Sequence, residues 1–76
     1  MLKDILIVDG YNVIFAWQSL KNLANESLEH ARMELRNQLL NYGKFKGYEV
    51  ILVFDGKYTK SIASIEEITK GFIEVY

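Results

Sequence analysis

The sequence predicts an α/β fold built on a parallel sheet, and three observations support this. Two continuous apolar runs, at residues 5–8 and 50–54, are rich in β-branched side chains, and each is followed by an Asp-Gly pair. Short runs without alternation are typical of strands that are covered on both faces. Between them, apolar side chains recur at the steps of three and four that indicate an amphipathic helix: Leu28, Ala31, Leu35, Leu39 and Tyr42. Strand, helix and strand make a right-handed βαβ unit, so the two strands run parallel.

The composition is that of one small globular domain. The chain has 76 residues, of which 50% are hydrophobic and 25% charged, with neither proline nor cysteine. The absence of cysteine excludes a disulfide scaffold and a thiol nucleophile, and it favours a cytoplasmic protein. No apolar run approaches the roughly 18 residues that a membrane span needs, so no membrane association is expected. The formal net charge of -1 gives no general attraction for nucleic acid, so any such binding must rest on a local site.

The segment between the first strand and the long helix is too long for a tight loop. We expect residues 10–26 to form a structured, packed loop with a short helical turn near 13–17, because this segment contains aromatic residues that solvent loops seldom carry. Ser27 is placed to cap the long helix. Gly43 and Gly47 supply stops for this helix, since glycine commonly follows a last helical turn.

The C-terminal part is predicted to add a short helix and a third strand. Ser64 and Glu67 make a capping-box pattern for a helix that ends at Gly71, and residues 72–76 then have the pattern of a third strand. An α/β domain seldom ends within a strand, because such a core is too small to stand alone. We therefore expect residues 1–76 to be the N-terminal part of a single, truncated domain.

Two aspartates come directly after the predicted parallel strands. Asp9 and Asp55 therefore lie at the carboxyl edge of the sheet, where α/β folds bind ligands, and there they could share a Mg²⁺ ion. Asn12 could orient a metal-bound water or a phosphate, and Lys57 and Lys60 could contact phosphates. The alternative interpretation is structural. Each aspartate then begins an Asp-Gly turn, Asn12 stabilises its loop, and the lysines belong to a solvated loop.

The remaining polar and aromatic residues give weaker signals. His30 is interpreted as a surface residue of the long helix. Tyr11, Phe15 and Trp17 could stack on bases, or they could anchor their segment to the core. No glycine-rich dinucleotide or phosphate-loop motif is present, and Tyr11 stands where an Asp-x-Asp phosphatase needs its second acid. These classes of nucleotide-binding and phosphatase sites are therefore excluded.

Several short motifs together resemble one known family. They are Ile7 to Ile14, Ala16-Trp17, Ser27-Leu28 with Ala31-Arg32, Gly47 to Val50, and Val53-Phe54-Asp55. In this combination the chain resembles the first half of the YacP-like NYN-domain proteins, which are bacterial members of the PIN-like ribonuclease superfamily. The resemblance implies a three-layer α/β/α PIN-like fold with a parallel sheet. It also implies acidic residues that bind Mg²⁺ or Mn²⁺, and metal-dependent endonucleolytic cleavage of RNA. For some relatives, it implies that the RNA is messenger RNA and that cleavage takes place on the ribosome.

The resemblance assigns roles to individual residues. Asp9 matches the first metal-binding acid, Asn12 the amide of the same motif, and Asp55 an acid at the end of the second strand. Lys57 and Lys60 are weaker candidates for contacts with the RNA backbone. The family's further acids are expected beyond position 76, so the 76-residue chain alone is expected to be inactive. The alternative function is a non-catalytic RNA- or protein-binding α/β module, which would show no coupling to a divalent metal.

The predicted strand order is 3-2-1, and it rests partly on the resemblance. Residues 5–8 are expected to pair with 50–54, and residues 72–75 to lie beside the latter. The outer edge of the first strand then has no partner. Such an edge invites self-association by strand addition.

Overall fold

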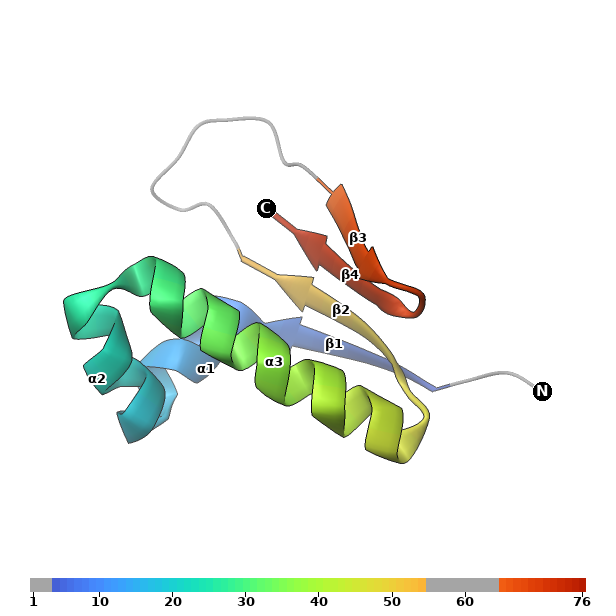
Figure 1. Cartoon of the computed structure of the whole chain (residues 1–76), viewed down its shortest axis with the longest axis horizontal. Coiled ribbons are helices and arrows are strands. Elements are labelled where there is room, and N and C mark those ends of the chain that lie inside the picture. Colours follow the sequence, from blue (N-terminus) through green and yellow to red (C-terminus); the bar gives the residue numbers. More distant parts are fainter. Residues whose placement is uncertain (1–3, 55–64) are drawn as a thin grey trace.

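The computed structural model of the chain describes residues 4–54 and 65–76, and it has the predicted α/β character (Figure 1). None of the helices in these two ranges is long and apolar enough to cross a membrane. In chain order the elements are β1 (Ile5–Asp9), α1 (Gly10–Ala16), α2 (Gln18–Glu26), α3 (Leu28–Lys46), β2 (Glu49–Val53), β3 (Ile65–Thr69) and β4 (Phe72–Val75).

The strands form one sheet in the order β1-β2-β4-β3. β1 runs parallel to β2, and β2 runs parallel to β4, with Ile7 opposite Ile51 and Ile51 opposite Ile73. The predicted parallel order of the first, second and last strands is confirmed. β3 lies outside β4, so the sheet has one strand more than the predicted order 3-2-1. Among the described residues β1 forms the other edge, and self-association through it stays a prediction.

The segment before β4 is a strand, and the helix predicted there is wrong. β3 pairs antiparallel with β4, with Glu67 opposite Ile73. Gly71, at φ 85°, permits the reversal between the two strands, because residues with a side chain rarely adopt this left-handed conformation. Ile68 packs from β3 against the core. Pairing with β4 and the packing of Ile68 outweigh the local capping-box pattern, whose first residue, Ser64, lies outside the described residues.

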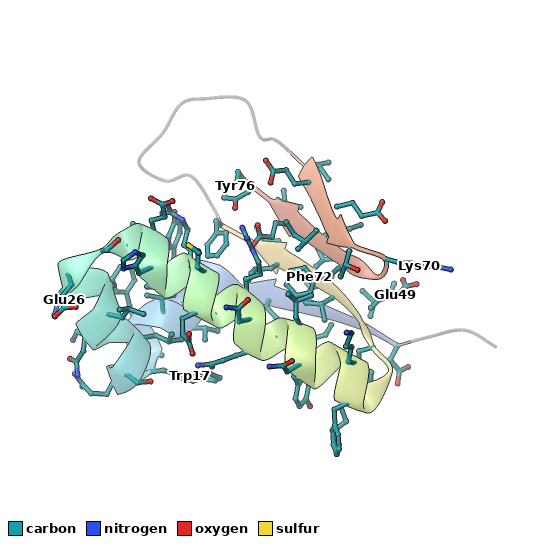
Figure 2. All side chains as sticks on the ribbon, viewed as in Figure 1. Trp17, Glu26, Glu49, Lys70, Phe72 and Tyr76 are labelled. Carbon is teal, nitrogen blue, oxygen red and sulfur yellow. The ribbon has the colours of Figure 1, made fainter. Side chains whose placement is uncertain are left out.

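Residues 10–26 form two helices instead of the predicted packed loop. Trp17 alone separates α1 from α2, and its extended backbone (φ -95°, ψ 122°) ends the first helix and begins the second. Ile14 and Leu20 are fully buried, whereas Trp17 is 50% exposed. Trp17 is labelled among the side chains in Figure 2. Aliphatic side chains therefore anchor most of this segment, a role that the prediction had considered for its aromatic residues.

Helix α3 starts at the predicted cap. The Ser27 hydroxyl oxygen accepts a hydrogen bond from the backbone N–H of His30 at 3.2 Å. The helix ends before Gly47, whose φ of 71° is left-handed. Gly43 was predicted as a stop but lies within the helix. A Cβ atom there would approach Val50 Cγ2 to 2.9 Å, so the missing side chain allows α3 to lie close to β2.

Helices α1 and α3 pack on one face of the sheet, and α2 packs against these two helices. The core between helices and sheet consists of Ile14, Leu20, Ala31, Leu35, Leu39, Val50, Leu52, Phe54 and Phe72. On the opposite face, the side chains of Ile5, Ile7 and Ile65 are 58%, 69% and 72% exposed. The described residues therefore build the sheet and one helical layer of the three layers that the family resemblance implies.

Candidate functional site

Asp9 and Asn12 form a compact polar pair where β1 passes into α1. Asp9 is the last residue of β1 and the N-cap of α1. Its Oδ1 accepts a hydrogen bond from the Asn12 backbone N–H (3.3 Å), and its Oδ2 accepts one from the Asn12 side-chain Nδ2 (2.6 Å). Both residues are exposed. The carboxylate of Asp9 is thereby held in one orientation. Its oxygen atoms still have lone pairs that can bind a ligand on the solvent side.

Gly10 makes the direct change from strand to helix possible. A Cβ atom at this position would lie 2.5 and 2.7 Å from Cε1 and Cδ1 of the Phe54 ring. Phe54 is only 1% exposed, so its ring has no room to move away. The glycine of this Asp-Gly pair therefore has a packing role. The aspartate has a different one, since its carboxylate begins α1 and orients Asn12.

Three aromatic rings lie together at the carboxyl edge of the sheet. The ring centroid of Phe54 is 5.2 Å from that of Tyr11 and 5.6 Å from that of Tyr76. Tyr11 packs against the core, which favours the anchoring role over base stacking for this residue. Phe15 and Trp17 are 53% and 50% exposed. The contacts of Phe54 with Tyr11 and Tyr76 bring together the chain segments at the ends of β1, β2 and β4.

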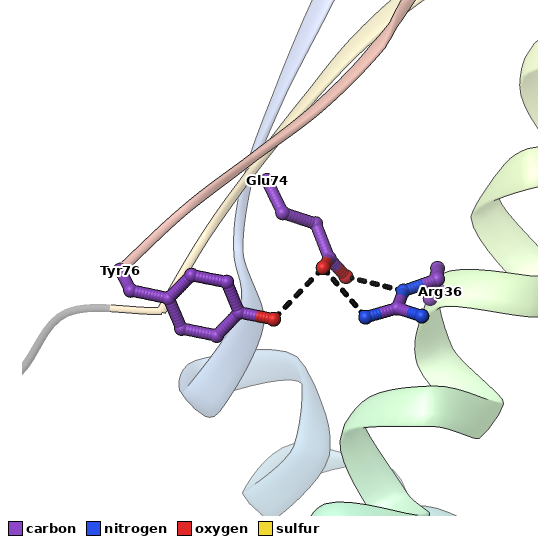
Figure 3. Close-up of polar contacts among 3 residues, drawn as sticks. All are labelled: Arg36, Glu74 and Tyr76. Carbon is purple, nitrogen blue, oxygen red and sulfur yellow. Dashed lines mark hydrogen bonds and ion pairs between the residues drawn. The ribbon is translucent and has the colours of Figure 1, made fainter. Parts of the chain in front are cut away.

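A buried carboxylate lies between β4 and α3, and the sequence analysis missed it. Glu74 is 0% exposed. Arg36 donates from Nε to Oε1 and from Nη2 to Oε2, both at 2.7 Å, and the Tyr76 hydroxyl donates to Oε2 at 2.8 Å (Figure 3). The available signal was the alternation along β4, which places Glu74 on the same face as the buried Phe72.

The hydrogen bonds to Glu74 raise the pKa of both groups that donate them. The hydrogen bond to Glu74 raises the pKa of Arg36, against an opposing effect of burial. Burial raises the pKa of the Tyr76 hydroxyl, and its hydrogen bond to Glu74 raises it further. Both donors therefore keep their protons at neutral pH. The carboxylate of Glu74 is satisfied by one cation and one neutral hydroxyl.

A second arginine lies one helical turn before Arg36. The Nη1 atom of Arg32 is 3.4 Å from the Tyr11 hydroxyl, a long hydrogen bond. Residues four apart on a helix share a face, so Arg32 and Arg36 are neighbours. Both are half-buried. Two guanidinium groups therefore lie along the helix side of the aromatic edge.

The predicted meeting of Asp9 with Asp55 stays a prediction, because Asp55, Lys57 and Lys60 lie outside the described residues. β2 does lead the chain to the edge that carries Asp9, since Val53 is in register with it. Within residues 4–54 and 65–76, no group of three or more His, Cys, Asp or Glu side chains is placed to hold a metal ion. The exposed carboxylate of Asp9 offers the hard oxygen atoms that Mg²⁺ and Mn²⁺ prefer. It therefore fits such an ion as one member of a larger ligand set.

Comparison of the sequence with known proteins found a matching family model and a matching relative. The model of the YacP-like NYN domain matches residues 6–76. The uncharacterized protein YacP of Bacillus subtilis (strain 168) is 46% identical over 59 residues, which is 78% of this chain and 35% of that protein. The chain thus matches about a third of the length of this curated relative. No solved structure matches.

Proposed function

Since this chain belongs to the YacP-like NYN-domain family, we propose that it carries part of the active site of a metal-dependent endoribonuclease. NYN domains are nuclease-type domains, so family membership itself indicates a hydrolytic, RNA-related role. The proposal adds the metal ion, internal cleavage of RNA and the residues involved. The observation that supports it most is the pair of Asp9 and Asn12, an oriented and exposed carboxylate at the ligand-binding edge of the fold.

In this proposal the chain's own residues bind and orient. Asp9 and Asp55 would hold Mg²⁺ or Mn²⁺. Such an ion, when bound, polarises a phosphate and activates a water for in-line attack on the phosphodiester bond. Asn12 keeps the Asp9 carboxylate in position through its backbone and side-chain N–H groups. Lys57 and Lys60 would contact backbone phosphates of the RNA as point charges.

The test uses a chimera of full length. Residues 6–76 of this chain replace the corresponding segment of the Bacillus relative, and the unmodified relative is assayed in parallel. We expect the chimera to cleave a single-stranded RNA in the presence of Mg²⁺ or Mn²⁺. Cleavage should stop in excess chelator and return when metal is restored. A messenger RNA with and without bound ribosomes forms a second pair of substrates, because the family resemblance implies messenger RNA as a target.

The outcome also separates the two functional alternatives. A non-catalytic module would bind RNA or a protein partner with no response to the divalent metal. If the relative cleaves RNA and the chimera does not, residues 6–76 of this chain do not support the chemistry. RNA binding by the chimera that is unaffected by metal, with no cleavage product, would replace the nuclease proposal by the binding module.

A further inference from the structure

Glu74 is a carboxylate at a fully buried position of β4, and such positions are usually occupied by apolar side chains. Taking a charge pair out of water costs several kcal/mol per ion, and buried pairs can often be replaced by apolar residues without loss of stability. Stability alone therefore does not account for Glu74. The pair with Glu74 has a second effect, because it fixes the plane of the Arg36 guanidinium, whose side chain is 28% exposed.

Arg36 keeps hydrogen-bond donors for a ligand. A guanidinium carries five N–H groups. Glu74 takes one from Nε and one from Nη2, which leaves three, including both on Nη1. Part of the side chain reaches the surface. Arg36 is therefore a cation of fixed orientation that is paired toward the protein interior and has donors left for solvent or a ligand.

Arg32 provides a second cation on the same helix face. Among the described residues it has no carboxylate within ion-pair distance, and its recorded partner is the Tyr11 hydroxyl. Tyr11 is adjacent to Asn12, which binds Asp9. The first turn of α1 therefore contacts Asp9 through Asn12 and Arg32 through Tyr11. Within the described residues, Arg32 is therefore a positive charge without a carboxylate partner, and Tyr11 joins it to the helix that begins at the candidate metal edge.

We infer that Arg32 and Arg36 form a phosphate clamp for single-stranded RNA bound at the carboxyl edge, an inference that rests on the proposed function. Arg32 supplies a positive charge that no carboxylate of the described residues compensates, and Arg36 supplies an oriented guanidinium, whose forked N–H groups match phosphate oxygens. The hydroxyl of Tyr11 accepts a hydrogen bond from Arg32, and the carboxylate of Glu74 accepts two from Arg36. Because the net charge of the chain is -1, a bound RNA has to be held by local cations of this kind.

The test measures binding without cleavage. A labelled single-stranded RNA is titrated with the 76-residue chain in excess chelator, over a series of salt concentrations. Arg32→Gln should weaken binding several-fold for every RNA sequence, and it should lower the slope of log K against log salt by about 0.7, the value for one lost phosphate contact. Lys44→Gln is the matched control. It removes one positive charge from the same helix about 18 Å further along the axis, and it should leave both quantities unchanged.

Arg36 requires a variant that does not leave Glu74 unpaired. The double variant Arg36→Met with Glu74→Leu replaces the ion pair by apolar side chains, and we expect it to fold and to bind RNA several-fold more weakly. Circular dichroism verifies the fold. Unchanged binding by Arg32→Gln, an equal effect of Lys44→Gln, or no RNA binding by the parent chain would overturn the inference. The binding titration is carried out without divalent metal, so its result does not depend on catalysis. RNA binding that depends on Arg32, together with a chimera that does not cleave RNA, would reject the proposed nuclease and retain the phosphate clamp.

Discussion

The guanidinium of Arg36 meets the buried carboxylate of Glu74 through two N–O contacts of 2.7 Å and so joins α3 to β4. Two parallel charged hydrogen bonds are the strongest arrangement that these side chains can make. Glu74 is fully buried, so it depends on this partner and on Tyr76 for all of its compensation. The position of β4 against the helices is therefore sensitive to Arg36.

Arg36→Met should destabilise the fold strongly. It leaves the Glu74 charge buried with only the Tyr76 hydroxyl as partner, which we expect to lower the free energy of unfolding by about 3 kcal/mol or more. Urea unfolding followed by circular dichroism measures this. In the double variant with Glu74→Leu most of the loss should disappear. Equal losses in the single and double variants would show that the unpaired charge is not the cause.

Gly10→Ala should destabilise the fold through a steric clash. The added methyl group would lie 2.5 Å from the Phe54 ring, and overpacking of this kind costs about 1–3 kcal/mol. Phe54→Leu shortens the opposing side chain, so it should reduce the effect of Gly10→Ala when the two changes are combined. Additive losses in the double variant would contradict the proposed clash.

Asp9→Asn in the full-length chimera should reduce RNA cleavage to background. The change removes a charge that the metal ion needs, while asparagine still serves as an N-cap for α1, so the melting temperature should change little. Asp4→Asn is the matched control, because Asp4 is an exposed aspartate just before the other end of β1. Cleavage that survives in Asp9→Asn would remove this residue from the mechanism.

The 76-residue chain alone should bind Mg²⁺ weakly and show no RNA cleavage above background. Its predicted ligands are the carboxylates of Asp9 and Asp55 and the amide of Asn12, which carry too little negative charge to displace the hydration shell of Mg²⁺. Isothermal titration with Mg²⁺ and an RNA cleavage assay beside the chimera measure both quantities. Cleavage equal to that of the chimera would show that these three residues are sufficient.

Stability in alkaline solution should depend on Tyr76. Its pKa is raised in the folded chain from an ordinary value of 10.0, so the folded state holds this proton more tightly than the unfolded state does. The stabilisation is complete below that ordinary pKa and is lost as the pH rises through the folded-state pKa. The free energy of unfolding should therefore fall less steeply above about pH 10 in Tyr76→Phe than in the parent chain. Parallel pH profiles would contradict this prediction.

The sequence by itself determined the elements that depend on short-range patterns. The apolar runs of β1 and β2, the Ser27 cap and the Gly47 end of α3 are all recognisable from neighbouring residues, and the handedness of βαβ units makes the two strands parallel. Asp9 and Asn12 stand out in the sequence, but their hydrogen bonds exist because α1 begins at Gly10, where a loop was predicted. The family followed from the same local motifs.

Only the tertiary structure decided the features that depend on distant partners. β3 is a strand because β4 pairs with it, although its local pattern favoured a helix. Gly43 continues α3 because Val50 of β2 packs against it, although glycine usually ends a helix. Glu74 is buried because Arg36, 38 residues earlier in the chain, lies opposite. Burial and pairing across such separations arise from packing, which outweighs the small preferences of local sequence.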